Sequence, residues 1–157
     1  MPSAPPPAGH PRFARAYARA VGDMDARGGA EHRRELLAPA RGVVVEVGSG
    51  TGSNFAHYPD AVERVIAIEP DPYLRGLSQE AAARARVPVE VRDGIAEALP
   101  AADASADAVV ASLVLCSVTD QQAALAEFRR VLRPGVRSSS TSTCAPPRRF
   151  SLWWRTR

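Results

Sequence analysis

Lysine is absent from this 157-residue sequence, so all twenty cationic side chains are arginines, and there are only two cysteines. The lack of lysine beside frequent alanine is typical of a GC-rich coding sequence and says nothing of function. Cys116 lies in an apolar segment and Cys144 among serines and threonines, with no Cys-x-x-Cys pair. This cysteine content excludes a disulfide scaffold and gives no sign of a metal site.

Long hydrophobic runs are also missing. No stretch reaches the roughly 18 apolar residues of a membrane span, and the proline-rich start, residues 1–11, lacks the apolar core of a signal peptide. The chain is 45% hydrophobic and 24% charged, which is typical of one globular domain. We therefore expect a cytoplasmic protein with no stable membrane insertion.

Acidic residues are missing from the last 22 positions. All seventeen Asp and Glu residues precede Gly135, whereas five arginines follow it, so residues 1–135 carry −2 and the tail carries +5 of the net charge of +3. A nucleic-acid-binding domain would show basic residues on its folded body. Because the excess lies in the tail, we expect no nucleic-acid partner.

What the sequence does contain is a regular alternation of helical and strand patterns. Apolar spacing predicts two short helices over residues 12–37, broken near Gly28. Strands are predicted at 43–47, 64–69, 87–92 and 108–115, and helices from about Thr51, over 72–86 and over 121–132. This alternation predicts a doubly wound, mostly parallel α/β sheet that binds its ligand beyond the C-terminal ends of the strands.

The strongest motif is the glycine loop, Glu-Val-Gly-Ser-Gly-Thr-Gly, from Glu46 to Gly52. Its glycines allow positive φ and close approach of the backbone, and the helix expected after it would present unpaired N–H groups to a ligand. The spacing is Gly-x-Gly-x-Gly, since Ser53 stands where a longer motif has its last glycine. Alone, the motif predicts a nucleotide-type ligand with modest specificity.

Two further acids follow predicted strands. Glu69 ends the second strand, where a carboxylate can accept both hydrogen bonds of a ribose diol. The alternative, a helix N-cap, fits Asp71 before Pro72 better. Asp93 ends the third strand, where it could accept from an adenine amino group, although Asp-Gly is also a common turn pair.

The fourth predicted strand, 108–115, meets its turn near residues 112–117. In this topology that turn faces the reacting end of the ligand. Cys116 lies within it, and the interpretation as a buried small hydrophobe is favoured over a reactive thiol.

Together these segments resemble the class I S-adenosylmethionine-dependent methyltransferases, in the group that includes the ubiquinone and menaquinone C-methyltransferases. The resemblance covers about residues 40–135 and includes the glycine loop, Glu69, Asp93 and the segment 128–135 that ends in Pro-Gly. Segments 50–59 and 113–118 are similar to the animal thiol methyltransferases and their bacterial relatives. The family has a Rossmann-like fold, and this chain would lack its usual C-terminal strands.

The resemblance implies S-adenosylmethionine as the cofactor and a small molecule as the methyl acceptor, either a thiol or a lipophilic compound. The glycine loop would line the methionine moiety with Glu46 near its ammonium, Glu69 would hold the ribose, and Asp93 with Ile95 would hold the adenine. An acid before the loop suits a zwitterionic sulfonium better than a pyrophosphate. The implied cofactor-binding residues are Glu46, Gly48, Ser49, Gly50, Gly52, Glu69, Pro70, Asp93, Gly94, Ile95 and Leu113.

No catalytic residue is assigned. Methyl transfer is an in-line displacement, so the protein mainly aligns the acceptor and excludes water. A thiol acceptor would react as its thiolate. Five histidines and tyrosines lie in the N-terminal segment or after the glycine loop, and a surface or packing role is favoured for each: His10, Tyr17, His32, His57 and Tyr58.

Three divisions follow: a proline-rich start and helical lid at 1–39, the cofactor-binding core at 40–135, and a tail rich in Ser, Thr, Arg and Trp at 136–157. The tail admits three interpretations: a disordered basic segment, a peripheral membrane anchor, and a truncated product whose reading frame shifts near Gly135. The last is favoured, because acids and the strand pattern end together there. It predicts an unpaired edge on the fourth strand, weak cofactor binding and impaired turnover.

Two other functions stay open. A nicotinamide-dependent oxidoreductase shares the fold and the ribose acid, but the glycine spacing, Glu46 and the position of Asp93 disfavour it. A catalytically impaired cofactor-binding module is the second alternative. The sequence determines neither the acceptor nor the oligomeric state.

Overall fold

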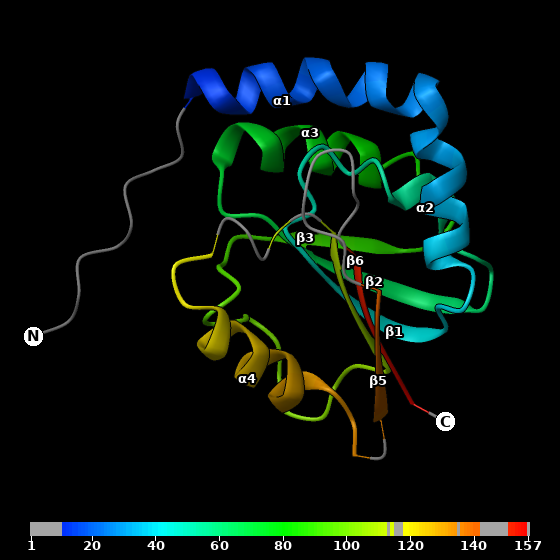
Figure 1. The fold of residues 1–157 in the computed structure, drawn as a ribbon, viewed down its shortest axis with the longest axis vertical. Helices are drawn as coiled ribbons and strands as arrows, with labels where there is room; N and C mark the ends of the chain where they lie inside the picture. The colour runs from blue at the N-terminus through cyan, green and yellow to red at the C-terminus, as the bar shows by residue number, and fades with distance from the viewer. Residues whose placement is uncertain (1–10, 113, 115–117, 135, 142–150, 157) are drawn as a thin grey trace, which may run out of the picture.

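A six-stranded sheet forms the centre of the protein. The computed structural model describes residues 11–112, 114, 118–134, 136–141 and 151–156. The strands lie in the order β3-β2-β1-β4-β6-β5 (Figure 1). Their bounds are β1 Gly42–Val47, β2 Val62–Ile68, β3 Val89–Arg92, β4 Ala108–Ser112, β5 Val136–Thr141 and β6 Ser151–Thr156.

The first four strands are parallel. Val45 of β1 lies opposite Ile66 of β2 and Val109 of β4, and β2 pairs in turn with β3. Valine and isoleucine dominate β1 and β2 because both faces of these strands are covered. The predicted doubly wound, mostly parallel α/β fold is therefore confirmed.

Helices cover both faces of this sheet. On one face lie α1 (Pro11–Met24), α2 (Ala30–Leu37) and α3 (Pro72–Ala82), and on the other lies α4 (Gln121–Val131) (Figure 1). The first face packs Leu37, Val44 and Phe55 into one core cluster, and the second packs Val45 and Phe128 into another. No helix in the described ranges is long and apolar enough to cross a membrane.

The helix boundaries follow local chemistry. A π-helical turn (Asp25–Gly29) separates α1 from α2, and its Gly28 adopts a φ of 95°, which explains the predicted break. Asp71 caps α3 and Asp120 caps α4, each accepting from two backbone N–H groups. Asp71 is thus the N-cap, which leaves Glu69 for another role.

The helix expected from about Thr51 is wrong. The only helical structure between β1 and β2 is a 3-10 turn (Phe55–His57). Gly52, Ser53 and Asn54 are poor helix formers, and Asn54 uses its side chain in a tertiary network described below. The glycine loop therefore has no α-helix N-terminus behind it.

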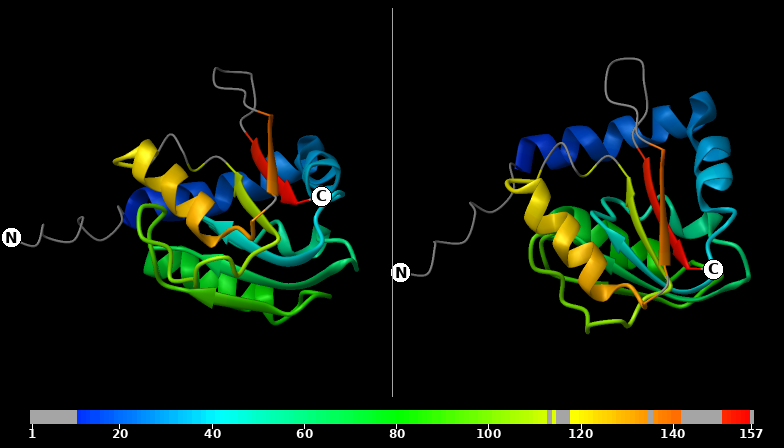
Figure 2. Two further views of the ribbon diagram at one scale, coloured as in Figure 1. Left: turned by 90° about the horizontal axis from the view of Figure 1, so that it is seen from below. Right: turned by 60° about the horizontal axis from the view of Figure 1, so that its bottom comes forward.

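The expectation that β4 has an unpaired edge is also wrong. β6 pairs antiparallel with β4, with Val110 opposite Trp153, and β5 pairs antiparallel with β6. Figure 2 shows this hairpin alongside β4. The backbone of β6 therefore pairs the edge of β4 that was expected to be open. The assignment of the tail to a shifted reading frame stays a prediction.

Candidate functional site

The C-terminal ends of β1, β2 and β3 bring three acids to one edge of the sheet. Glu46 lies within β1, opposite Ala67 of β2, while Glu69 and Asp93 directly follow β2 and β3. The registers align these ends, since Val47 lies opposite Ile68 and Ile68 lies opposite Arg92. The structure thus places the acids on adjacent strands, as a ligand site of this topology requires.

The glycine loop folds back over the end of β2. The N–H groups of Gly48 and Ser49 both donate to the Ile68 carbonyl, at 2.8 and 3.1 Å. The Ser49 hydroxyl shares a buried hydrogen bond of 2.9 Å with the hydroxyl of Ser78 in α3. Gly48 and Gly50 adopt φ values of 67° and 57°, which disfavour any side chain there. The loop is therefore fixed before any ligand arrives.

Glu69 is held by the backbone. Its Oε2 accepts from the Gly50 N–H at 2.8 Å and its Oε1 from the Asp71 N–H at 3.0 Å. The residue is only 5% exposed, and burial raises the pKa of its carboxyl while these two N–H bonds oppose the rise. Each oxygen retains a lone pair. The carboxylate is thus oriented and able to accept from a diol.

Glu46 is held by side chains instead. Asn54 Nδ2 donates to its Oε1 at 2.9 Å, and the Tyr58 hydroxyl donates to its Oε2 at 2.7 Å. Glu46 is 2% exposed, and burial raises the pKa of its carboxyl to about 7, against the opposing effect of these bonds and of Arg33. Tyr58 has the packing role that the sequence favoured, with a polar anchor added.

Tyr17 of α1 lies over the glycine loop. A Cβ on Gly50 would lie 3.2 Å from its ring, so glycine leaves just enough room for the aromatic side chain. Burial raises the pKa of the Tyr17 phenol, Arg33 opposes the rise, and Glu69 and Glu46 add to it. Tyr17 therefore lies near both buried acids, and the covering role of the N-terminal helix stays a prediction.

The third strand end is more open. The Asp93 side chain is 72% exposed and pairs with Arg75 of α3 at 3.0 Å. Arg75 also donates to the carbonyls of Glu69 and Pro70, at 2.8 and 3.0 Å, and so joins the second strand end to the third. Gly94 leaves no room for a side chain, because a Cβ there would lie 2.7 Å from the Pro100 ring.

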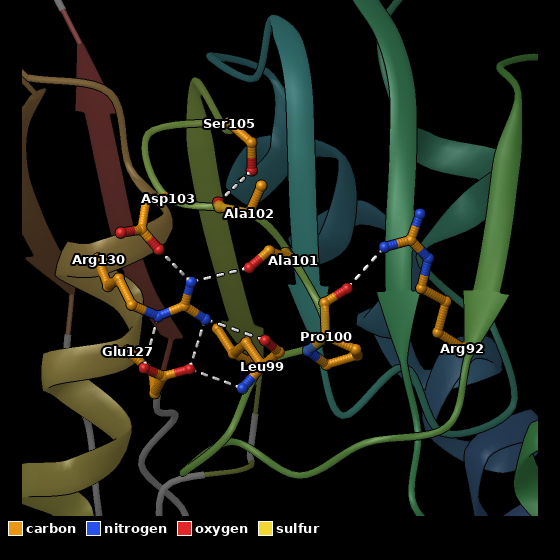
Figure 3. A network of polar contacts seen from close by, with 9 residues as sticks. All are labelled: Arg92, Leu99, Pro100, Ala101, Ala102, Asp103, Ser105, Glu127 and Arg130. Carbon is orange, nitrogen blue, oxygen red and sulfur yellow. Dashed lines mark hydrogen bonds and ion pairs between the residues drawn. The ribbon is translucent and has the colours of Figure 1, made fainter.

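A clamp on α4 holds the loop that follows Asp93 and the half-buried Ile95. Arg130 donates to the carbonyls of Leu99 and Ala101 at 3.0 and 2.9 Å, and pairs with Asp103 and Glu127, each at 2.7 Å (Figure 3). Glu127 accepts in turn from the Leu99 N–H at 2.8 Å. The loop after the third strand is therefore held by α4, which covers the face of the sheet opposite to α3.

Sequence reasoning missed four polar residues of this edge: Arg33, Asn54, Arg75 and Arg130. Asn54 and Arg130 lie in segments 50–59 and 128–135, which were singled out only as part of the resemblance, and no motif marked Arg33 or Arg75. Leu113, Cys116 and His10 lie outside the described residues. Among the histidines considered, His57 is partly buried and its pKa is lowered by burial.

Fold and site together define a class: a Rossmann-like α/β domain with a glycine loop and strand-end acids at its ligand edge. The family model described as "Methyltransferase domain" matches residues 45–138. The chain belongs to this family, the class I S-adenosylmethionine-dependent methyltransferases.

The relatives agree. Human thiol S-methyltransferase TMT1B is 37% identical over 114 residues, which cover 66% of this chain and 46% of that protein. The ubiquinone/menaquinone biosynthesis C-methyltransferase UbiE of Rubrivivax gelatinosus is 33% identical over 120 residues, which cover 76% of this chain and 45% of that protein. The chain thus spans about half the length of these curated relatives.

Solved structures give the same fold. A SAM-dependent methyltransferase from Thermotoga maritima has a TM-score of 0.64 at 27% identity, covering 84% of this chain and 59% of that one. A Haloferax volcanii protein, solved in complex with the Trm112 methyltransferase activator, has a TM-score of 0.65 at 24% identity. The match covers 84% of this chain and 59% of that one.

Proposed function

We propose that this protein is an S-adenosylmethionine-dependent methyltransferase acting on a small-molecule acceptor. The observation that carries the proposal is the buried Glu69 carboxylate, fixed by the N–H groups of Gly50 and Asp71 beside the glycine loop. A buried acid with both oxygens oriented and spare lone pairs is preorganised for a ribose diol.

The residues present fit this cofactor. Glu69 and Pro70 would hold its ribose, and Asp93, Gly94 and Ile95 its adenine. Glycine-loop residues Gly48, Ser49, Gly50 and Gly52 would line its methionine portion, with Glu46 attracting the ammonium. When bound, the cofactor supplies a sulfonium-activated methyl group. The chain's own part is to orient the acceptor and exclude water, and Tyr17 already covers the loop.

Charge favours this ligand over a dinucleotide. Two buried acids, Glu46 and Glu69, lie beside the loop, and the edge has no α-helix N-terminus after the glycines. A pyrophosphate would meet repulsion there without the usual compensation, whereas a zwitterionic sulfonium carries its own cations. The nicotinamide alternative is therefore not favoured, in line with the family.

A thiol is the acceptor class that we favour. TMT1B and its relatives are named thiol S-methyltransferases, and UbiE is named a C-methyltransferase. A thiol would react as its thiolate. A cytoplasmic location, the lack of a nucleic-acid partner, the three divisions of the chain and the role of Leu113 stay predictions.

The test is turnover by the purified chain. The chain is incubated with S-adenosylmethionine and a panel of thiols and quinols, and S-adenosylhomocysteine is measured by mass spectrometry. We expect product with at least one thiol, and none from Glu69→Ala under the same conditions. Binding of NADH in place of S-adenosylhomocysteine would overturn the proposal.

A further inference from the structure

A chain of polar contacts, part-buried at Arg33 and buried at Glu46, runs from α2 to β1. Arg33 Nη1 of α2 donates to Asn54 Oδ1 at 3.0 Å, and Asn54 Nδ2 donates to Glu46 Oε1 at 2.9 Å. Arg33 Nε also pairs with Asp25 Oδ1 at 3.1 Å. We call Arg33, Asn54 and Glu46 the arginine relay. It joins the helical segment before β1 to an acid inside β1.

The relay is shielded from solvent. The Arg33 side chain is 14% exposed, and Asn54 and Glu46 are both buried. An arginine fixed there interacts more strongly with a nearby carboxylate than one in water, because solvent screens the pair less. The amide of Asn54 fixes the geometry, since its oxygen takes the guanidinium and its nitrogen reaches the carboxylate.

Few other groups reach Glu46. Tyr58 donates to its second oxygen, and Tyr17 of α1 interacts with it electrostatically. Its neighbours on the adjacent strands are the apolar Ala67 and Val110. Among these groups, Arg33 is the only cation that favours the charged form of Glu46. The hydrogen bonds from Tyr58 and Asn54 favour the charged form of this acid most, and Arg33 adds to them without touching it.

We propose that Arg33, acting through Asn54, is a positioning residue that keeps the Glu46 carboxylate oriented and negatively charged toward the ammonium of the cofactor. This inference rests on the proposed function. Asp25 lies in the turn that joins α1 to α2, so its ion pair links the relay to the helix that carries Tyr17. Arg33 thus connects the turn after α1, through Asp25, with Glu46 in β1, through Asn54.

The first experiment needs no ligand. The carboxyl ¹³C signal of Glu46 is followed from pH 5 to 9 in the wild-type chain, in Arg33→Gln and in Arg33→Lys. We expect Arg33→Gln to raise the titration midpoint of Glu46. Arg33→Lys should return the midpoint most of the way to the wild-type value. Arg34→Gln is the matched control, because Arg34 is exposed and pairs with Glu31. An unmoved midpoint in a folded Arg33→Gln chain would overturn the inference.

The second experiment compares two ligands by calorimetry. S-adenosylhomocysteine carries the ammonium, and 5′-methylthioadenosine lacks it. If the midpoint rises by one unit from about 7, Arg33→Gln should weaken the first ligand about fivefold at pH 7 and less than twofold at pH 8.5. The second ligand should bind equally to both chains.

The two failures are distinguishable. Equal weakening of both ligands at every pH would mean that Arg33 only supports the fold, and would overturn the inference. If neither ligand binds the wild-type chain, the proposed function fails. The carboxyl titration still decides in that case whether Arg33 sets the charge of Glu46.

Discussion

The first two strand ends differ sharply from the third, although all three carry an acid. Glu46 and Glu69 are buried with both carboxylate oxygens hydrogen-bonded, whereas Asp93 is 72% exposed in an ion pair with Arg75. Desolvation raises the pKa of both buried carboxyls. The sequence therefore shows where a strand-end acid lies but not its pKa, which depends on its burial in the fold.

The two buried acids also differ from each other. Backbone N–H groups hold Glu69, so no substitution of a partner side chain removes its hydrogen bonds. The side chains of Asn54 and Tyr58 hold Glu46, so its charge can be changed by mutating its neighbours. The second strand end is thus fixed by the backbone, and the first is adjustable through side chains.

The largest effect is expected on replacing Glu46 by glutamine. Between pH 4.5, the ordinary pKa of a glutamate, and about pH 7, Glu46 is protonated in the folded chain but ionised in the unfolded chain. The free energy of unfolding therefore falls as pH rises through this interval. The fall is roughly 3 kcal/mol by pH 8. Glu46→Gln should remove it and be more stable than wild type at pH 8.

Urea denaturation at pH 5 and pH 8 measures this difference. The matched control is Glu35→Gln at an exposed position of α2, which should keep the wild-type fall in unfolding free energy between pH 5 and pH 8. If the free energy of unfolding of Glu46→Gln still fell between pH 5 and pH 8 as in wild type, the burial of this acid would not be what distinguishes the first strand end.

A smaller effect is expected from Gly50→Ala, which disturbs both buried acids. Its φ of 57° costs an alanine about 1–2 kcal/mol, and the new Cβ would press on the Tyr17 ring at 3.2 Å. The N–H bond to Glu69 should then lengthen and cofactor affinity fall. Gly76→Ala in α3, where a Cβ meets nothing within 4 Å, should instead gain about 0.5–1 kcal/mol. Thermal unfolding and calorimetry test both variants.

The third strand end depends on its clamp rather than on Asp93. Arg130→Met should cost about 1–2 kcal/mol, because it leaves the Leu99 and Ala101 carbonyls without their donors. Amide hydrogen exchange should increase in residues 95–104 and stay unchanged in the glycine loop. Faster exchange in the glycine loop would mean that the strand ends are not independent.

The smallest effect is expected from Asp93→Asn. An ion pair this exposed contributes little to stability, about 0.2–1 kcal/mol, and salt screens it. Its loss should leave the unfolding midpoint nearly unchanged and weaken adenosine-containing ligands only modestly. An effect as large as that of Glu69→Ala would abolish the distinction between buried and exposed strand ends.

Much of the fold could be predicted from the sequence. The valine run gave β1 because a doubly covered strand must be apolar on both faces, and Asp71 before Pro72 correctly marked the start of α3. The helix predicted after the glycine loop is wrong, because Asn54 binds Glu46 and Arg33 with its side chain and the segment forms only a 3-10 turn. The partner of β4 was missed as well, since antiparallel pairing with β6 joins segments distant in sequence.

The site was predicted less completely. Glu69 follows from strand-end position alone, which local sequence shows. Arg33 and Arg130 could not be found in this way, because long arginine side chains reach partners 21 and 31 residues distant that only the fold brings near. Likewise, the burial of Glu46 under Asn54 and Tyr58 depends on how the loop after the glycines folds back.

We propose above all that Glu69 makes this edge a cofactor site. Titration calorimetry of S-adenosylhomocysteine into wild type, Glu69→Ala and the exposed Glu63→Ala at the other end of β2 tests it most directly. We predict binding to wild type and Glu63→Ala, and affinity weaker by roughly 10- to 100-fold in Glu69→Ala. A folded wild-type chain that does not bind, or a Glu69→Ala chain that binds as tightly as wild type, would contradict the account.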